Sequence, residues 1–204
     1  MEPKKTAPER AESNNHNHFN SQPIDRLEEF LPEDYITTSD LENHSFNKRY
    51  LIEDFLESGR CYQFFGAWKS CKTLVVMDLA CHLANGIQWA ERRTEQSLVI
   101  WVASESCEDV NRRLAAWKIH HSISGPMSFV IRTKPLHLDE LNFAVKLRDE
   151  VKQIQEAFPG MPLLVVVDTV ARSMSGKFSE NDEGLRLFSN NILDEVIRPL
   201  ECAG

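Results

Sequence analysis

The sequence has no apolar run long enough to span a bilayer, and its N-terminal segment lacks the apolar centre of a signal peptide. We therefore expect a cytoplasmic protein with no membrane partner. Positive charge is also scarce, since 23 lysines and arginines face 31 aspartates and glutamates, for a net charge of -8. This balance excludes a surface that wraps nucleic acid on all sides, although it is compatible with a local basic strip or a DNA site formed in an oligomer.

Cysteine is infrequent and shows no paired spacing. No two of the five cysteines are two or three residues apart, so no zinc-ligand pair is visible, and the odd number does not suggest a disulfide framework. We interpret Cys61, Cys81 and Cys202 as buried apolar thiols in a reducing compartment. His16 and His18 have no carboxylate or cysteine placed to complete a metal site. Residues 1–46 are predicted to be a disordered or irregular tail, and residues 47–204 a single domain.

Regular patterning begins near Arg49. Apolar spacing predicts a helix over residues 50–59, and β-prone residues predict a short strand at 61–65. Further strands are predicted at 97–104, 127–131 and 162–168, and helices at 73–86, 108–121, 141–158 and 183–200. This alternation predicts an α/β fold, with a mostly parallel sheet and helices on both faces. Ligands of such sheets bind beyond the carboxyl ends of the strands.

The segment GAWKSCKT, after the first predicted strand, is one residue short of a phosphate-binding loop. That pattern is Gly, four residues, Gly, Lys, then Ser or Thr, and Cys71 occupies the place of the second glycine. Lys72 would reach the β and γ phosphates of ATP, and the Thr73 hydroxyl would ligate Mg²⁺. The predicted nucleotide-binding residues are Gly66, Ala67, Trp68, Lys69, Ser70, Cys71, Lys72 and Thr73.

Two acidic residues follow the neighbouring strands. Glu105 comes after the second strand, where it can orient or deprotonate an attacking water, or else cap the following helix. Asp168 closes the fourth strand, as a Mg²⁺-binding Walker B aspartate does, and burying it unpaired would be costly. Glu105 and Lys72 are thus the predicted catalytic residues, and Thr73 and Asp168 the predicted metal ligands.

These motifs together resemble the RecA-like AAA ATPases typified by the plasmid-encoded RepA hexameric replicative helicase, over roughly Tyr50 to Gly204. The resemblance implies a RecA-like P-loop NTPase fold, ATP bound at subunit borders, a homo-oligomer such as a hexamer, and a role in DNA replication or recombination. It assigns Lys72 and Thr73 to Walker A, Glu105 to the catalytic glutamate and Asp168 to Walker B. Arg172, Asn181 and Asp182 match the loop after Walker B, and no DNA-contacting residue is assigned.

The sequence departs from that family at two points. A left-handed backbone at Cys71 would cost about 1–2 kcal/mol, enough to weaken nucleotide binding about tenfold. The last helix leads to LECAG, where the family continues into a further strand, so we expect a sheet that lacks its last strand. Two functions follow: an ATP-hydrolysing, helicase-like domain, or a non-catalytic nucleotide-binding or interaction module with a degenerate loop.

Overall fold

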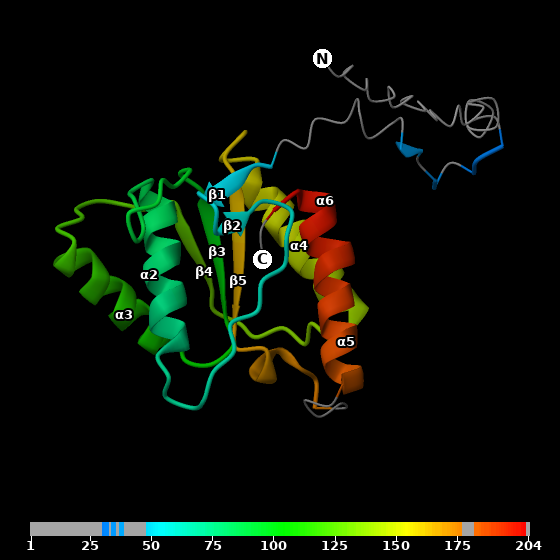
Figure 1. Cartoon of the computed structure of the whole chain (residues 1–204). Helices are drawn as coiled ribbons and strands as arrows, with labels where there is room; N and C mark the ends of the chain where they lie inside the picture. Colours follow the sequence, from blue (N-terminus) through cyan, green and yellow to red (C-terminus); the bar gives the residue numbers. More distant parts are fainter. Residues whose placement is uncertain (1–29, 33, 36, 39–47, 177–181, 203–204) are drawn as a thin grey trace, which may run out of the picture. The chain divides into compact units, whose positions relative to one another are not determined.

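The computed structural model describes residues 30–32, 34–35, 37–38, 48–176 and 182–202 (Figure 1). The chain separates into Met1–Asn47 and Lys48–Gly204, and each is described by itself. In the first, the Tyr35 N–H donates a hydrogen bond to the Pro32 carbonyl over 3.0 Å. Most of the predicted tail, residues 1–46, lies outside the described residues.

A parallel sheet forms the centre of the second unit. Its strands are β3 (Leu98–Ala103), β4 (Phe129–Arg132) and β5 (Leu163–Asp168), in the order β4-β3-β5. All six residues of β3 are buried, because this strand is paired on both edges and covered on both faces. The register places Ala103 opposite Asp168, so the carboxyl ends of β3 and β5 lie together.

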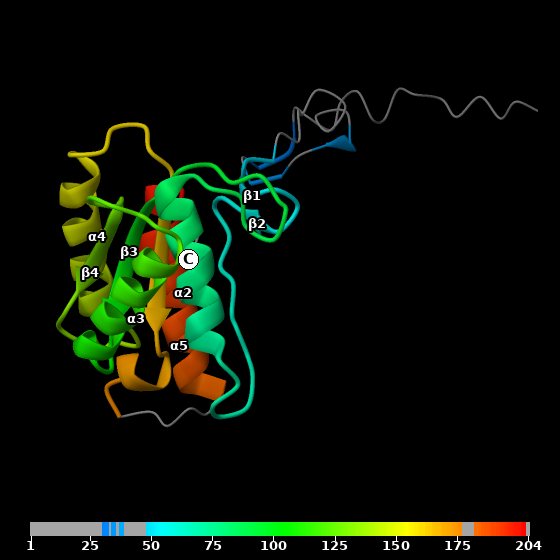
Figure 2. The same ribbon diagram turned by 90° about the vertical axis from the view of Figure 1, so that its left-hand side faces the viewer.

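Helices cover both faces of this sheet (Figures 1 and 2). One face carries α2 (Lys72–Asn85) and α3 (Cys107–His120). The other carries α4 (Leu141–Gln155) and a C-terminal helical run of α5 (Asp182–Asn191), the π-helical segment η3 (Ile192–Ile197) and α6 (Arg198–Leu200). Alternate residues of β3 enter the two cores: Val99 and Trp101 pack on the α2 side, and Leu98 and Ile100 on the α4 side. The predicted α/β class and parallel sheet are confirmed.

The helix boundaries follow local signals. The helix predicted at 73–86 is α2, which ends where Gly86 adopts a left-handed conformation with φ of 65°. In α3, the Ser106 side chain caps the first turn by accepting a hydrogen bond from the Asp109 N–H, and Glu108 and Asp109 face the positive end of the helix dipole.

The helix predicted over residues 50–59 is wrong. The structure has an antiparallel pair there, β1 (Tyr50–Ile52) with β2 (Leu56–Glu57), turning at Asp54 with φ of 53°. The buried side chains of Leu51, Ile52 and Leu56 fit a helical spacing equally well. Pairing with a distant segment decides the outcome, because Ile52 bridges to Thr94 and the Leu51 carbonyl accepts a hydrogen bond from the Glu95 N–H.

The strand predicted at 61–65 is also absent, since these residues have no regular secondary structure. A strand requires a partner for its backbone groups, and within the described residues none pairs with this segment. Most of its side chains are exposed: Phe64 is 40% exposed and Phe65 80%. Cys61 is exposed as well, so the prediction that its thiol is buried is wrong.

Candidate nucleotide-binding site

The ends of β3 and β5 and the start of α2 meet at one edge of the sheet. The Thr73 hydroxyl donates a hydrogen bond to Oδ1 of Asp168 over 3.2 Å. The Thr169 hydroxyl donates to Oε1 of Glu105 over 3.4 Å, and the Ser104 N–H donates to the Asp168 carbonyl over 2.9 Å. The structure thus brings together three residues that the sequence separates widely: Thr73, Glu105 and Asp168.

Lys72 closes over the loop that precedes α2. Its ammonium group donates to the carbonyls of Gly66 at 2.8 Å and Ala67 at 2.9 Å. A Cβ on Gly66 would lie 2.6 Å from the Ser70 hydroxyl oxygen, so a larger residue there would require the Ser70 side chain to move. Among the described residues, the hydrogen-bond acceptors of the Lys72 ammonium group are these two backbone oxygens.

The backbone of this loop is shaped for an anion. Lys69 and Cys71 both adopt left-handed conformations, with φ of 63° and 62°. Cys71 is the N-cap of α2 and makes no side-chain cap. Among the interactions of the described residues, the N–H groups of Cys71, Lys72 and Thr73 have no acceptor. Free N–H groups at the positive end of a helix dipole form a site for phosphate.

Cys71, in the place of the second glycine of the loop pattern, adopts a left-handed backbone conformation, which glycine tolerates best. Its thiol is exposed and turned toward the Lys69 carbonyl, with 3.9 Å between Sγ and O. The loop keeps its turn into α2 with a side chain in place. The cysteine therefore imposes a conformational cost, about 1–2 kcal/mol, rather than a different loop.

The Asp168 carboxyl is set up to hold a cation. Burial raises its pKa, and so does the negative charge of Glu105, while the hydrogen bond from Thr73 and the charges of Arg113 and Lys72 lower it. A hydroxyl and a carboxylate in contact, beside a second carboxylate, make an oxygen ligand set suited to Mg²⁺. The residues present therefore fit a Mg²⁺–nucleotide complex.

The three residues predicted to lie in the loop after Walker B have different places in the structure. Arg172 is exposed in η2 (Ala171–Ser173), Asp182 begins α5, and Asn181 lies outside the described residues. Two further residues of the site were not predicted from the sequence: Thr169, which follows Asp168 directly, and Arg113, whose charge acts on Asp168 from α3. Thr169 could have been found from the sequence, because it directly follows Asp168 at the end of a predicted strand. Arg113 could not, because its effect on Asp168 depends on how α3 packs.

A family model for the AAA domain (AAA_25) matches residues 25–203. The chain belongs to this AAA domain family. Membership implies nucleotide binding by a P-loop NTPase fold, and AAA domains typically bind ATP with Mg²⁺. A search of curated proteins found no match. Among the described residues of this AAA domain, no helix combines the length and apolar character that a membrane crossing requires.

Proposed function

We propose that this AAA domain binds Mg²⁺–ATP and hydrolyses it, as the ATPase part of a RepA-like, helicase-type protein in DNA replication or recombination. The contact between the Thr73 hydroxyl and Asp168, beside the loop spanned by Lys72, carries the proposal. It joins the two residues that would ligate Mg²⁺, at the sheet edge where nucleotides bind. The link to DNA rests on sequence resemblance.

Each residue has a definite role in this proposal. Lys72 exchanges its two carbonyl acceptors for phosphate oxygens, and the free N–H groups of residues 71–73 bind the same phosphates. Thr73 and Asp168 would hold Mg²⁺, which neutralises charge that develops on the phosphoryl oxygens. Glu105 orients the attacking water and accepts its proton.

A second function follows from Cys71. The left-handed backbone at this residue costs about 1–2 kcal/mol, which reduces affinity about tenfold if it must persist in the bound state. This observation favours a domain that binds nucleotide but does not turn it over. In that case, ATP would act as a structural ligand or a signal.

We also propose that the protein forms a homo-oligomer, and the family resemblance suggests a hexamer. Trp68 is 85% exposed and Phe65 80%, both next to the phosphate loop. Lys69 lies over the Trp68 ring, 4.1 Å from its centroid. Large exposed aromatic residues at this position suit a border at which a neighbouring subunit covers the nucleotide.

The experiment is to measure ATP binding and hydrolysis by the native chain and by Cys71→Gly, with Lys72→Ala as control. The ATPase proposal expects hydrolysis by both, with binding about tenfold tighter in Cys71→Gly. Hydrolysis by Cys71→Gly alone supports the non-catalytic function for the native chain. Saturable binding that Lys72→Ala leaves unchanged would show that the site is wrongly assigned.

A further inference from the structure

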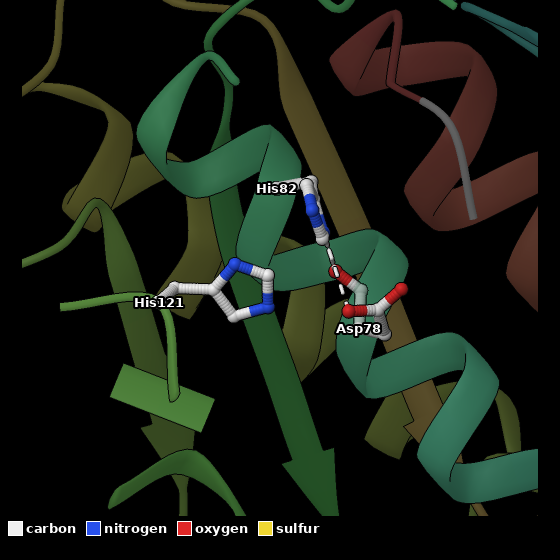
Figure 3. A group of neighbouring side chains, drawn as sticks. All are labelled: Asp78, His82 and His121. Atoms are coloured by element: carbon white, nitrogen blue, oxygen red, sulfur yellow. Dashed lines mark hydrogen bonds and ion pairs between the residues drawn. The ribbon is translucent and has the colours of Figure 1, made fainter. Parts of the chain in front are cut away.

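A second group of polar side chains lies on α2, apart from the phosphate loop. Asp78 and His82 are one helical turn apart on α2, and His121 comes from the C-cap of α3. One ligand atom from each lies within 4.8 Å of the other two. Figure 3 shows the Asp78 carboxylate and the two imidazole rings converging. His82 is only 9% exposed, whereas Asp78 and His121 are half-buried, which leaves a path from solvent.

The surrounding contacts hold these groups in place. The Asp78 carboxylate accepts a hydrogen bond from the Trp89 indole at 2.9 Å and from the Trp117 indole at 2.8 Å. A carboxylate has about four lone-pair sites, so both oxygens keep further acceptor capacity. The Trp117 ring also stacks on His121, with ring centroids 4.1 Å apart. Indole donors and ring stacking are the kind of outer contacts that orient metal ligands.

A backbone carbonyl of α2 assigns the tautomer of His82. Its Nδ1 lies 2.7 Å from the Asp78 backbone carbonyl, an acceptor, so Nδ1 carries the proton and Nε2 keeps its lone pair. A histidine that donates one N–H to a carbonyl and offers its other nitrogen is the usual form of a metal ligand.

Among the described residues, Asp78 forms no ion pair with a lysine or an arginine. Its one ion-pair contact there is with His82, with 3.4 Å from Nδ1 to Oδ1. His82 also lies in the last turn of α2, and His121 follows the last turn of α3. The negative ends of both helix dipoles therefore favour a positive charge at this place.

From this geometry we propose that Asp78, His82 and His121 form a binding site for a divalent transition-metal ion of the Zn²⁺ type. Two imidazoles and one carboxylate match the ligands that Zn²⁺ accepts, and three protein ligands leave one position for water. Mg²⁺ prefers oxygen ligands alone, so this site discriminates against the ion used with ATP. His82 lies ten residues after Lys72, about 15 Å along α2, so the two sites are separate.

The test is calorimetric titration of the full chain, stripped of metal, with Zn²⁺ in the presence of excess Mg²⁺. The expected result is saturable binding of one ion per chain. His121→Gln should weaken it by about 10–100-fold or more, and His82→Gln likewise. His120→Gln is the matched control, because His120 is adjacent and exposed and lies outside the group. It should bind as the native chain does.

Two further controls exclude other sites. His16→Gln with His18→Gln removes the histidine pair near the N-terminus, and Asp168→Asn removes the carboxylate beside the phosphate loop; both variants should still bind Zn²⁺. His82 is buried, so the His82→Gln substitution can disturb folding. The decisive variant is therefore His121→Gln, because His121 is only half-buried, and circular dichroism checks that this variant is folded. Absence of saturable Zn²⁺ binding, or binding unchanged in folded His121→Gln, would overturn the proposal.

Discussion

The hydroxyl of Thr73, in the first turn of α2, donates a hydrogen bond to the carboxylate of Asp168, the last residue of β5, over 3.2 Å. This contact joins the start of α2, directly after the phosphate loop, to the end of β5, and it puts the two predicted Mg²⁺ ligands in direct contact. Because the interaction needs only a hydroxyl, its role can be tested by comparing a substitution that keeps the hydroxyl with one that removes it.

Thr73→Ala should lower Mg²⁺-dependent ATP hydrolysis about 100-fold or more, since metal ligation contributes several kcal/mol to the transition state. Thr73→Ser keeps the hydroxyl and should retain most of the activity. The measurement is the rate of phosphate release at saturating ATP over a range of Mg²⁺ concentrations. Equal rates in the alanine and serine variants would contradict the role of Thr73 as a ligand.

Glu105→Gln should lower hydrolysis by about 10²–10⁴-fold, because the amide cannot accept the proton of the attacking water. ATP binding should remain, since Glu105 contacts Thr169 rather than the loop. The matched control is Glu108→Gln, three residues along in the first turn of α3. Single-turnover hydrolysis and nucleotide affinity are measured on both variants, and a similar loss in both would argue against a catalytic role.

ATP should protect Cys71 from alkylation, because its exposed thiol lies in the phosphate loop. Cys81 and Cys202 should stay unlabelled with or without ATP, since burial raises the pKa of each thiol to about 12 and leaves little thiolate below pH 9. Peptide mapping after iodoacetamide treatment checks both statements. Labelling of Cys71 that nucleotide leaves unchanged would mean that phosphate does not bind at this loop.

Asp78→Ala should destabilise the metal-free protein by about 1–3 kcal/mol, because the indole N–H groups of Trp89 and Trp117 lose their acceptor. Asp149→Ala, which removes an exposed ion pair with Arg148, should change stability by less than about 0.5 kcal/mol. Urea unfolding in the presence of a chelator gives both values. Similar effects of the two substitutions would contradict the role of Asp78 as the acceptor for the two indole N–H groups.

Glu53 should titrate far below its usual range. Hydrogen bonds from Arg93 lower the pKa of Glu53 from 4.5 to about 2. Since the folded-state pKa is below the unfolded one, this pair stabilises the fold above pH 4.5, and the contribution is lost as pH falls toward 2. Carboxyl chemical shifts measured by NMR should show the midpoint, and Arg93→Ala should return it toward 4.5. A midpoint that the substitution leaves in place would contradict the pairing.

From Lys72 onward, local patterns in the sequence were enough to predict the order of helices and strands and the residues at the strand ends. The buried run of β3, the helix stop at Gly86 and the position of Asp168 were all predicted, because they depend on local periodicity and backbone preference. Parallel strands end at one edge of a sheet, so Glu105 and Asp168 were expected near the phosphate loop before any geometry was known.

Only the tertiary structure decided which segments pair through backbone hydrogen bonds. The apolar pattern of residues 50–59 encodes burial but not pairing, so bonding to residues 94–95 turned a predicted helix into a hairpin. Likewise, residues 61–65 form no strand, because no partner pairs with them in the described part of the chain. The group of Asp78, His82 and His121 exists only because α3 packs beside α2 and brings His121 to a carboxylate 43 residues earlier in the sequence.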